Sequence, residues 1–134
     1  MSDMSVHISI NIRLGFDIPK VQCVAPLGLE NGNIKDSAIA TSGDWSSFFR
    51  GAFGRLNLKA TKSNSGAWSA KKNSVGQWFQ VDFGTVVEVR RVATQGRQNS
   101  NQWVTSYTLA YSNNGADFVP YGGKRVRPEG GRVM

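Results

Sequence analysis

Histidine and cysteine are almost absent from this chain of 134 residues, which has one of each, His7 and Cys23. A structural zinc site uses about four ligands, mostly Cys and His, so the chain lacks the residues for one. A nucleophile activated by histidine would have to use His7. The 9 acidic residues form no recognisable pair, and no glycine-rich phosphate loop is present. We therefore expect no enzymatic activity, no metal site and no cofactor.

Long hydrophobic runs are also lacking. No stretch has the length of a membrane-spanning helix, so no transmembrane segment is expected. Met1–Asn11 contains Asp3 and His7 and lacks the apolar core of a signal peptide. With 40% hydrophobic residues, the sequence predicts a soluble globular domain that is long enough to bury a core.

Acidic residues are scarce relative to basic ones, 9 against 16, which gives a net charge of +7. The excess is uneven: residues 21–75 carry seven basic and three acidic side chains, residues 122–134 carry four and one, and residues 76–121 balance. A positive surface favours an anionic partner, either phospholipid or acidic glycan. We expect no nucleic-acid partner, because no recognition helix, zinc ligand set or RNA-binding signature accompanies the charge.

The centre of the chain shows strand patterns rather than a helical stripe. Apolar and polar residues alternate over Gln77–Phe83, and β-branched residues fill Val86–Ala93. Trp103–Ser112 is a third strand candidate, and Asn113–Gly115 is a hairpin signal because Asn and Gly tolerate positive φ. With Ala116–Tyr121 pairing back, the pattern predicts an antiparallel meander.

Ser5–Phe16 has the clearest alternation in the chain. Its apolar members are Val6, Ile8, Ile10, Ile12, Leu14 and Phe16. The strand could dock onto another protein, or it could pair with the domain's own sheet. The second interpretation is favoured, because exposed strand edges are usually covered.

Several motifs occur in an order that resembles the discoidin family, also called the coagulation factor V/VIII type C domain. They are Cys23 with Pro26–Gly32, Ile34–Asp36, Arg55–Asn57, Gly66–Trp68, Gln77–Gly84, Val92–Arg97, Trp103–Tyr107 and Tyr111–Gly115. The resemblance covers about residues 22–121. It implies an all-β, jelly-roll β-sandwich whose loops at one end bind lipid head groups, glycans or protein partners.

The resemblance also implies a domain organisation. It consists of an N-terminal extension with one strand (1–20), a discoidin-like domain (21–121) and a basic, glycine-rich tail (122–134). Family members continue for several strands and pair the opening Cys with a later one, so we expect this fold to lack its last strands. Ser5–Phe16 is expected to cover part of an open sheet edge. The family is mostly extracellular, which implies an extracellular or cell-surface location.

Residues 41–54 correspond to the first projecting loop of the family. Trp45 and Phe48 are expected to be exposed there, whereas Phe53 is expected to fold back. Ser46 and Phe49 are further candidate ligand-binding residues of this loop. Lys71 and Lys72 are expected at the same end of the sandwich. By the same resemblance Trp68 belongs to the core. Asp36 is interpreted as structural rather than catalytic.

Residues 97–102 correspond to a third loop, whose tip is unusually polar. Its residues are Arg97, Gln98, Asn99, Ser100, Asn101 and Gln102. Amides suit hydroxyl-rich ligands, and Arg97 either holds an anion or pairs with an acid of the sheet. The sequence predicts a non-enzymatic module for cell adhesion that recognises glycan or anionic phospholipid head groups. The alternative is a domain that binds an extracellular protein, such as a receptor or collagen.

Overall fold

The computed structural model describes residues 5–11, 26–85, 87–89 and 91–126. Its strands are β1 (Ser5–Asn11), β2 (Ile39–Thr41), β3 (Gln77–Val81), β4 (Ser106–Ser112) and β5 (Val119–Val126). Three short 3-10 turns lie between β1 and β3, namely η1 (Asp36–Ala38), η2 (Ser47–Phe49) and η3 (Gly51–Phe53). The predicted all-β class is confirmed.

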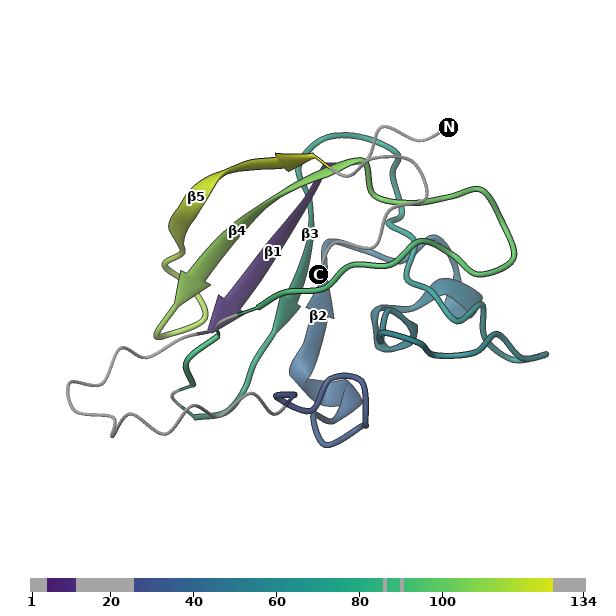
Figure 1. Ribbon diagram of the computed structural model, residues 1–134, viewed down its shortest axis with the longest axis horizontal. Helices are drawn as coiled ribbons and strands as arrows, with labels where there is room; N and C mark the ends of the chain where they lie inside the picture. The colour runs from purple at the N-terminus through teal and green to yellow at the C-terminus, as the bar shows by residue number, and fades with distance from the viewer. Residues whose placement is uncertain (1–4, 12–25, 86, 90, 127–134) are drawn as a thin grey trace.

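The five strands form one sheet in the order β2-β3-β1-β4-β5 (Figure 1). β1 runs parallel to both of its neighbours, and the outer pairs β2–β3 and β4–β5 are antiparallel. The long loops that connect β2 to β3 and β3 to β4 extend to one side of the sheet (Figure 1). These loops therefore supply the surface beyond the sheet.

The N-terminal strand occupies a different place from the one the sequence suggested. It pairs with the domain's own sheet, as predicted, but it lies at the centre, with β3 on one side and β4 on the other. The expectation that it covers a sheet edge is wrong. Alternation identifies a strand with two distinct faces, but it contains no information about which strands become its neighbours. Residues 12–16 of the predicted strand lie outside the described residues.

The predicted meander is only partly correct. β4 and β5 form the expected antiparallel hairpin, and Gly115 in its turn has φ 73°. β3 and β4 are not neighbours, because β1 separates them. The described residues of Val86–Ala93 form a loop, from which Val89 and Val92 pack against the core. β5 continues to Val126 and thus includes the first five residues of the segment expected to be a tail.

The core lies on one face of the sheet. Phe79 and Val81 on β3, and Tyr107 and Leu109 on β4, stand two residues apart and point to the same side. Loops contribute the other members of the buried cluster, Ile34 and Ala70. The Trp68 ring lies 5.5 Å from the Phe79 ring in an edge-to-face arrangement, which confirms the predicted core position of Trp68.

Arg55 fastens the segment before β2 to the rest of the domain. Its guanidinium donates to the carbonyl oxygens of Leu29 and Ile34, at 2.7 and 2.8 Å, and to the carboxylate of Asp36 at 2.6 Å. The Arg55 side chain is only 9% exposed, and its bonds to the two carbonyl oxygens are partly buried, whereas the Asp36 side chain is 62% exposed. The ion pair confirms the structural role expected for Asp36.

We predict that Arg55→Met lowers the free energy of unfolding by about 3 kcal/mol, because it leaves partly buried carbonyl oxygens without a donor. Urea denaturation measures the change. Lys59→Met is the matched control, since Lys59 is exposed. Equal urea midpoints for the two variants would contradict the role assigned to Arg55.

Candidate functional site

One carboxylate organises the first loop (residues 41–54). Oδ1 of Asp44 accepts hydrogen bonds from Thr41 Oγ1 at 2.9 Å, from the Gly51 amide at 3.1 Å and from Trp68 Nε1 at 3.0 Å. Asp44 thereby joins the end of β2, the start of η3 and an aromatic side chain of the core. The loop is held by these contacts in place of regular secondary structure.

The first loop is also bonded to the second loop (residues 69–76). The Trp45 amide donates to the Ser69 carbonyl at 2.8 Å, and the Lys71 amide donates to the Gly43 carbonyl at 3.1 Å. Gly43 has φ 145°, and a Cβ there would lie 3.1 Å from Cβ of Lys71. The close approach requires glycine, and it places Lys71 directly beside the loop that carries Trp45.

The aromatic residues of the first loop differ in exposure. Trp45 is 66% exposed, as the sequence suggested. Phe48 and Phe49 are half-buried, with ring centroids 5.4 Å apart, so Phe48 is less exposed than expected. Phe48 is held in place because its carbonyl accepts from the Ser65 amide and its own amide donates to the Ser46 hydroxyl. Trp45 is thus the aromatic residue of this loop that is available to a ligand.

Phe53, which the sequence predicted to fold back, is half-buried. The Arg50 guanidinium lies 5.1 Å from the centre of its ring. This cation–π contact covers the ring from one side.

The second loop supplies positive charge and one apolar side chain. Residues 71–76 are all exposed, including Lys71 and Lys72. Val75 is 78% exposed, and it was not among the site residues predicted from the sequence. The available signal was a single apolar residue within the otherwise polar run between Lys72 and Gly76.

The third loop (residues 97–102) is attached to the first loop through Arg97. The guanidinium of Arg97 lies 4.9 Å from the centre of the Phe49 ring, and Nη1 donates to Gln102 Oε1 at 3.0 Å. The sequence offered an anion or an acid of the sheet as the partner of Arg97. The observed partners of Arg97 are instead the ring of Phe49 in the first loop and the side-chain amide of Gln102 in its own loop.

The amides of the third loop differ in the hydrogen bonds that they make. Gln98 donates to the Leu58 carbonyl at 2.9 Å and accepts from the Ala60 amide at 3.4 Å. Asn99 and Asn101 are exposed, and Ser100 between them is half-buried. All four amide side chains of this loop are exposed, but Gln98 and Gln102 also hydrogen-bond within the protein, at Leu58, Ala60 and Arg97.

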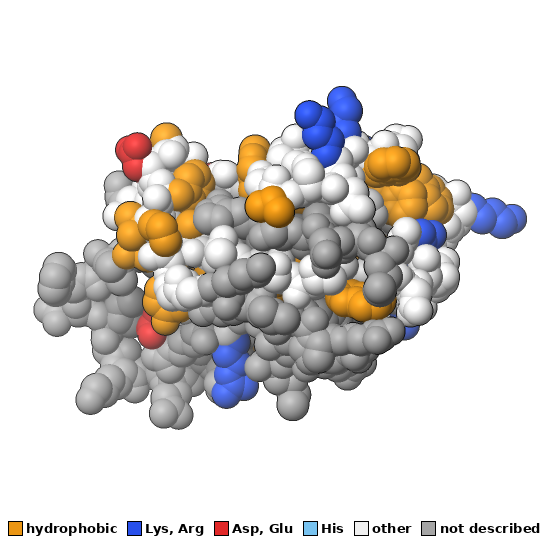
Figure 2. Space-filling view, turned by 90° about the horizontal axis from the view of Figure 1, so that it is seen from above, with side chains coloured by type: hydrophobic (Ala, Val, Ile, Leu, Met, Phe, Trp, Pro, Cys, Tyr) orange, Lys and Arg blue, Asp and Glu red, His pale blue; other side chains and the backbone are white. Residues whose placement is uncertain are grey.

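The end of the molecule that carries the three loops, here called the loop end, combines two kinds of side chain on its surface. Figure 2 shows hydrophobic side chains next to Lys or Arg side chains at one end of the molecule. The exposed apolar and basic residues of the first two loops include Trp45, Lys71, Lys72 and Val75. An apolar group flanked by positive charge suits an interface that is apolar inside and anionic outside.

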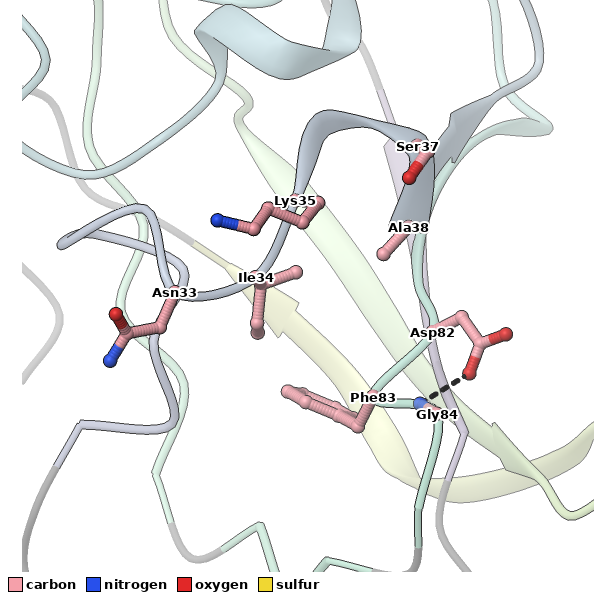
Figure 3. A pocket seen from close by; sticks show the side chains of 8 residues that line it. All are labelled: Asn33, Ile34, Lys35, Ser37, Ala38, Asp82, Phe83 and Gly84. Carbon is pink, nitrogen blue, oxygen red and sulfur yellow. Dashed lines mark hydrogen bonds between the residues drawn. The ribbon is translucent and has the colours of Figure 1, made fainter.

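A hollow that is lined by none of the residues of these loops lies between the segment around η1 and the residues after β3 (Figure 3). Its acid, Asp82, accepts from the Gly84 amide at 2.8 Å, which stabilises the turn after β3. In the part of the chain that the structure describes, no group of three His, Cys, Asp or Glu side chains is arranged to hold a metal ion. No helix among those residues is long and apolar enough to cross a membrane.

The F5/8 type C domain model matches residues 34–132, most of the chain. The chain belongs to the F5/8 type C domain family. The discoidin resemblance and the β-sandwich fold inferred from it are therefore confirmed. β1 lies outside the matched residues.

Similar proteins include lactadherin of Rattus norvegicus, which is 38% identical over 104 residues, and coagulation factor V of Bos taurus, which is 34% identical over 105 residues. Lactadherin of Mus musculus is 36% identical over 104 residues. Each match covers 74% of this chain. The matched stretch makes up only 24%, 5% and 22% of the length of these relatives, in that order.

We predict that Asp44→Ala accelerates hydrogen exchange of the Gly51 amide and lowers the free energy of unfolding by about 2 kcal/mol, because three donors lose their common acceptor. Asp44→Asn is the matched control, since its amide oxygen can still accept. Its exchange rate and its free energy of unfolding should lie between those of the unchanged protein and those of Asp44→Ala. Exchange at Gly51 that is unchanged in Asp44→Ala would show that the loop does not depend on this carboxylate.

Proposed function

We propose that this discoidin domain is a non-enzymatic binding module that attaches to anionic phospholipid at a cell surface and supports adhesion there. One observation carries the proposal. The exposed Trp45 lies on a loop that is hydrogen-bonded to the loop of Lys71 and Lys72. An extracellular or cell-surface location goes with this proposal.

The physical chemistry of the exposed residues supports a membrane partner. A Trp ring is apolar and keeps one N–H donor, so it is stable at the boundary between head groups and acyl chains. Val75 adds apolar surface on the neighbouring loop. Lys71 and Lys72 attract anionic head groups, and each basic residue near such a surface contributes about 1 kcal/mol.

The third loop fits contact with head groups better than insertion. Asn99 and Asn101 offer donors and acceptors at its tip, and this loop presents no exposed apolar residue. Insertion is assigned to the first two loops because they hold Trp45 and Val75. The third loop is expected to contact the layer of lipid head groups.

The decisive experiment compares vesicle flotation, with and without phosphatidylserine, and binding to a glycan array. Flotation that requires the anionic lipid supports the proposal. Glycan binding without flotation would assign the loops to sugars. Absence of both would leave an extracellular protein, such as a receptor or collagen, as the partner of the same loops.

We predict that Trp45→Ala weakens vesicle binding by about 2 kcal/mol, roughly thirtyfold in Kd, because the variant has no ring to transfer from water into the membrane. The fold should be retained, since an exposed ring contributes little to stability. Tyr121→Ala is the matched control, because Tyr121 is 61% exposed on β5, at the opposite edge of the sheet from β2. Equal vesicle affinities of the two variants would argue against insertion of Trp45.

We predict that Lys71→Glu combined with Lys72→Glu lowers affinity for anionic vesicles and reduces its dependence on salt, since fewer ionic contacts remain to be screened. Lys35→Glu with Arg91→Glu changes the net charge by the same amount at exposed positions outside the three loops. If both double variants lose affinity equally, the attraction comes from total charge and not from the second loop.

A further inference from the structure

β1 joins two strand pairs, β2–β3 and β4–β5, that do not pair with each other directly. Five residue pairs align it with β3, from Val6 beside Gln77 to Ile10 beside Val81. Seven pairs align it with β4, from Ser5 beside Ser106 to Asn11 beside Ser112. Without β1 the sheet would separate into the pairs β2–β3 and β4–β5, each with an unpaired inner edge.

The space between β3 and β4 has the dimensions of one strand. Neighbouring strands lie about 4.8 Å apart, so strands on either side of a third are about 9.6 Å apart. Both inner edges belong to strands that carry buried core residues, Phe79 and Val81 on β3 and Tyr107 and Leu109 on β4. A segment that occupies this space must be extended and must match an apolar face.

The register shows which segment fits. Ile8 is aligned with Phe79 and with Leu109, and the polar residues His7 and Ser9 fall at the alternate positions. This period of two is the strongest alternation in the chain. The fitting occupant is therefore a copy of β1 itself, and β1 lies outside the residues that match the family model.

The chain length between β1 and β2 permits more than one arrangement. Residues 12–38 separate Asn11 from Ile39, and the 14 residues 12–25 alone can span up to about 46 Å. A β1 strand can thus reach the space between β3 and β4 of an adjacent copy. Exchange preserves every strand pairing, since the same residues meet in the same register.

We propose that the space between β3 and β4 is a strand-acceptor site that a second copy of this chain can fill with its own β1. Reciprocal filling gives a strand-exchanged dimer whose two sheets each contain a strand from the partner copy. The dimer forms at high protein concentration, because exchange gains no new strand pairing within the sheet and must overcome the entropy of association.

Cross-linking of the full chain tests the proposal. In a Cys23→Ser background, His7→Cys is combined with Thr108→Cys, two positions aligned in register on adjacent strands. Such Cα atoms lie within the range that a disulfide can bridge. The protein is refolded at low and at high concentration, the monomer and dimer fractions are separated, and each is oxidised and run on a denaturing, non-reducing gel.

The expected result is an internal disulfide in the monomer fraction and a covalent dimer from the dimer fraction. Ser9→Cys with Thr108→Cys is the control, because Ser9 is aligned with Ala110 and its Cα lies about 8 Å from position 108, too far for a disulfide. Absence of a dimer at any concentration, or a dimer fraction with internal disulfides only, would overturn the proposal.

A second measurement does not depend on the cysteine variants. The full chain with Ile8→Pro has a weakened β1, since proline in a central strand removes a ladder donor. It should bind a fluorescent peptide with the sequence Ser5–Asn11 about tenfold more tightly than the same peptide with Ile8→Pro, because proline removes a ladder donor and leaves its acceptor unpaired. Equal fluorescence anisotropy curves for the two peptides would reject a strand-acceptor site.

Discussion

The pairing of β1 with two strands at once is the constraint on which the rest of the fold depends. β3 contributes Phe79 and Val81 to the core, and β4 contributes Tyr107 and Leu109. These residues form one cluster because a strand between β3 and β4 holds both at a fixed spacing. The loop residues that pack against the cluster, including Trp68, depend on the same spacing. The N-terminal strand is therefore an integral part of the core-bearing sheet.

The loop end follows a different principle, in which polar side chains replace regular secondary structure. Asp44 accepts from three donors, Arg55 donates to three acceptors, and Gln98 bridges to the Leu58–Ala60 segment. Because these groups are satisfied internally, the loops keep their shape without burying every aromatic ring. Trp45 is the ring that remains outside this network of contacts, and its exposure is what the proposed membrane contact uses.

The sequence predicted local elements better than it predicted which strands and loops contact each other. Alternation located β3, and the Asn113–Gly115 signal located the β4–β5 turn, since both depend on a few adjacent residues. Val86–Ala93 was misassigned, because β-branched residues also fill a core from a loop, as Val89 and Val92 do. The central place of β1 and the stacking of Arg97 on Phe49 arise between segments distant in sequence, which periodicity does not encode. The family resemblance supplied the loop positions, but not the engagement of Gln98 with Leu58 and Ala60.

The loop surface and the strand-acceptor site are physically separable. The three loops connect β2 to β3 and β3 to β4, so they contain no residue of β1 and stay with their own copy when β1 is exchanged. A strand-exchanged dimer therefore carries two sets of Trp45, Lys71 and Lys72 in one particle. Linked binding sites that engage one surface bind more tightly than either site alone, because the second contact becomes intramolecular. Exchange of a central strand would in this way convert a weak single contact with a membrane into a bivalent one, without any change in the residues that make the contact.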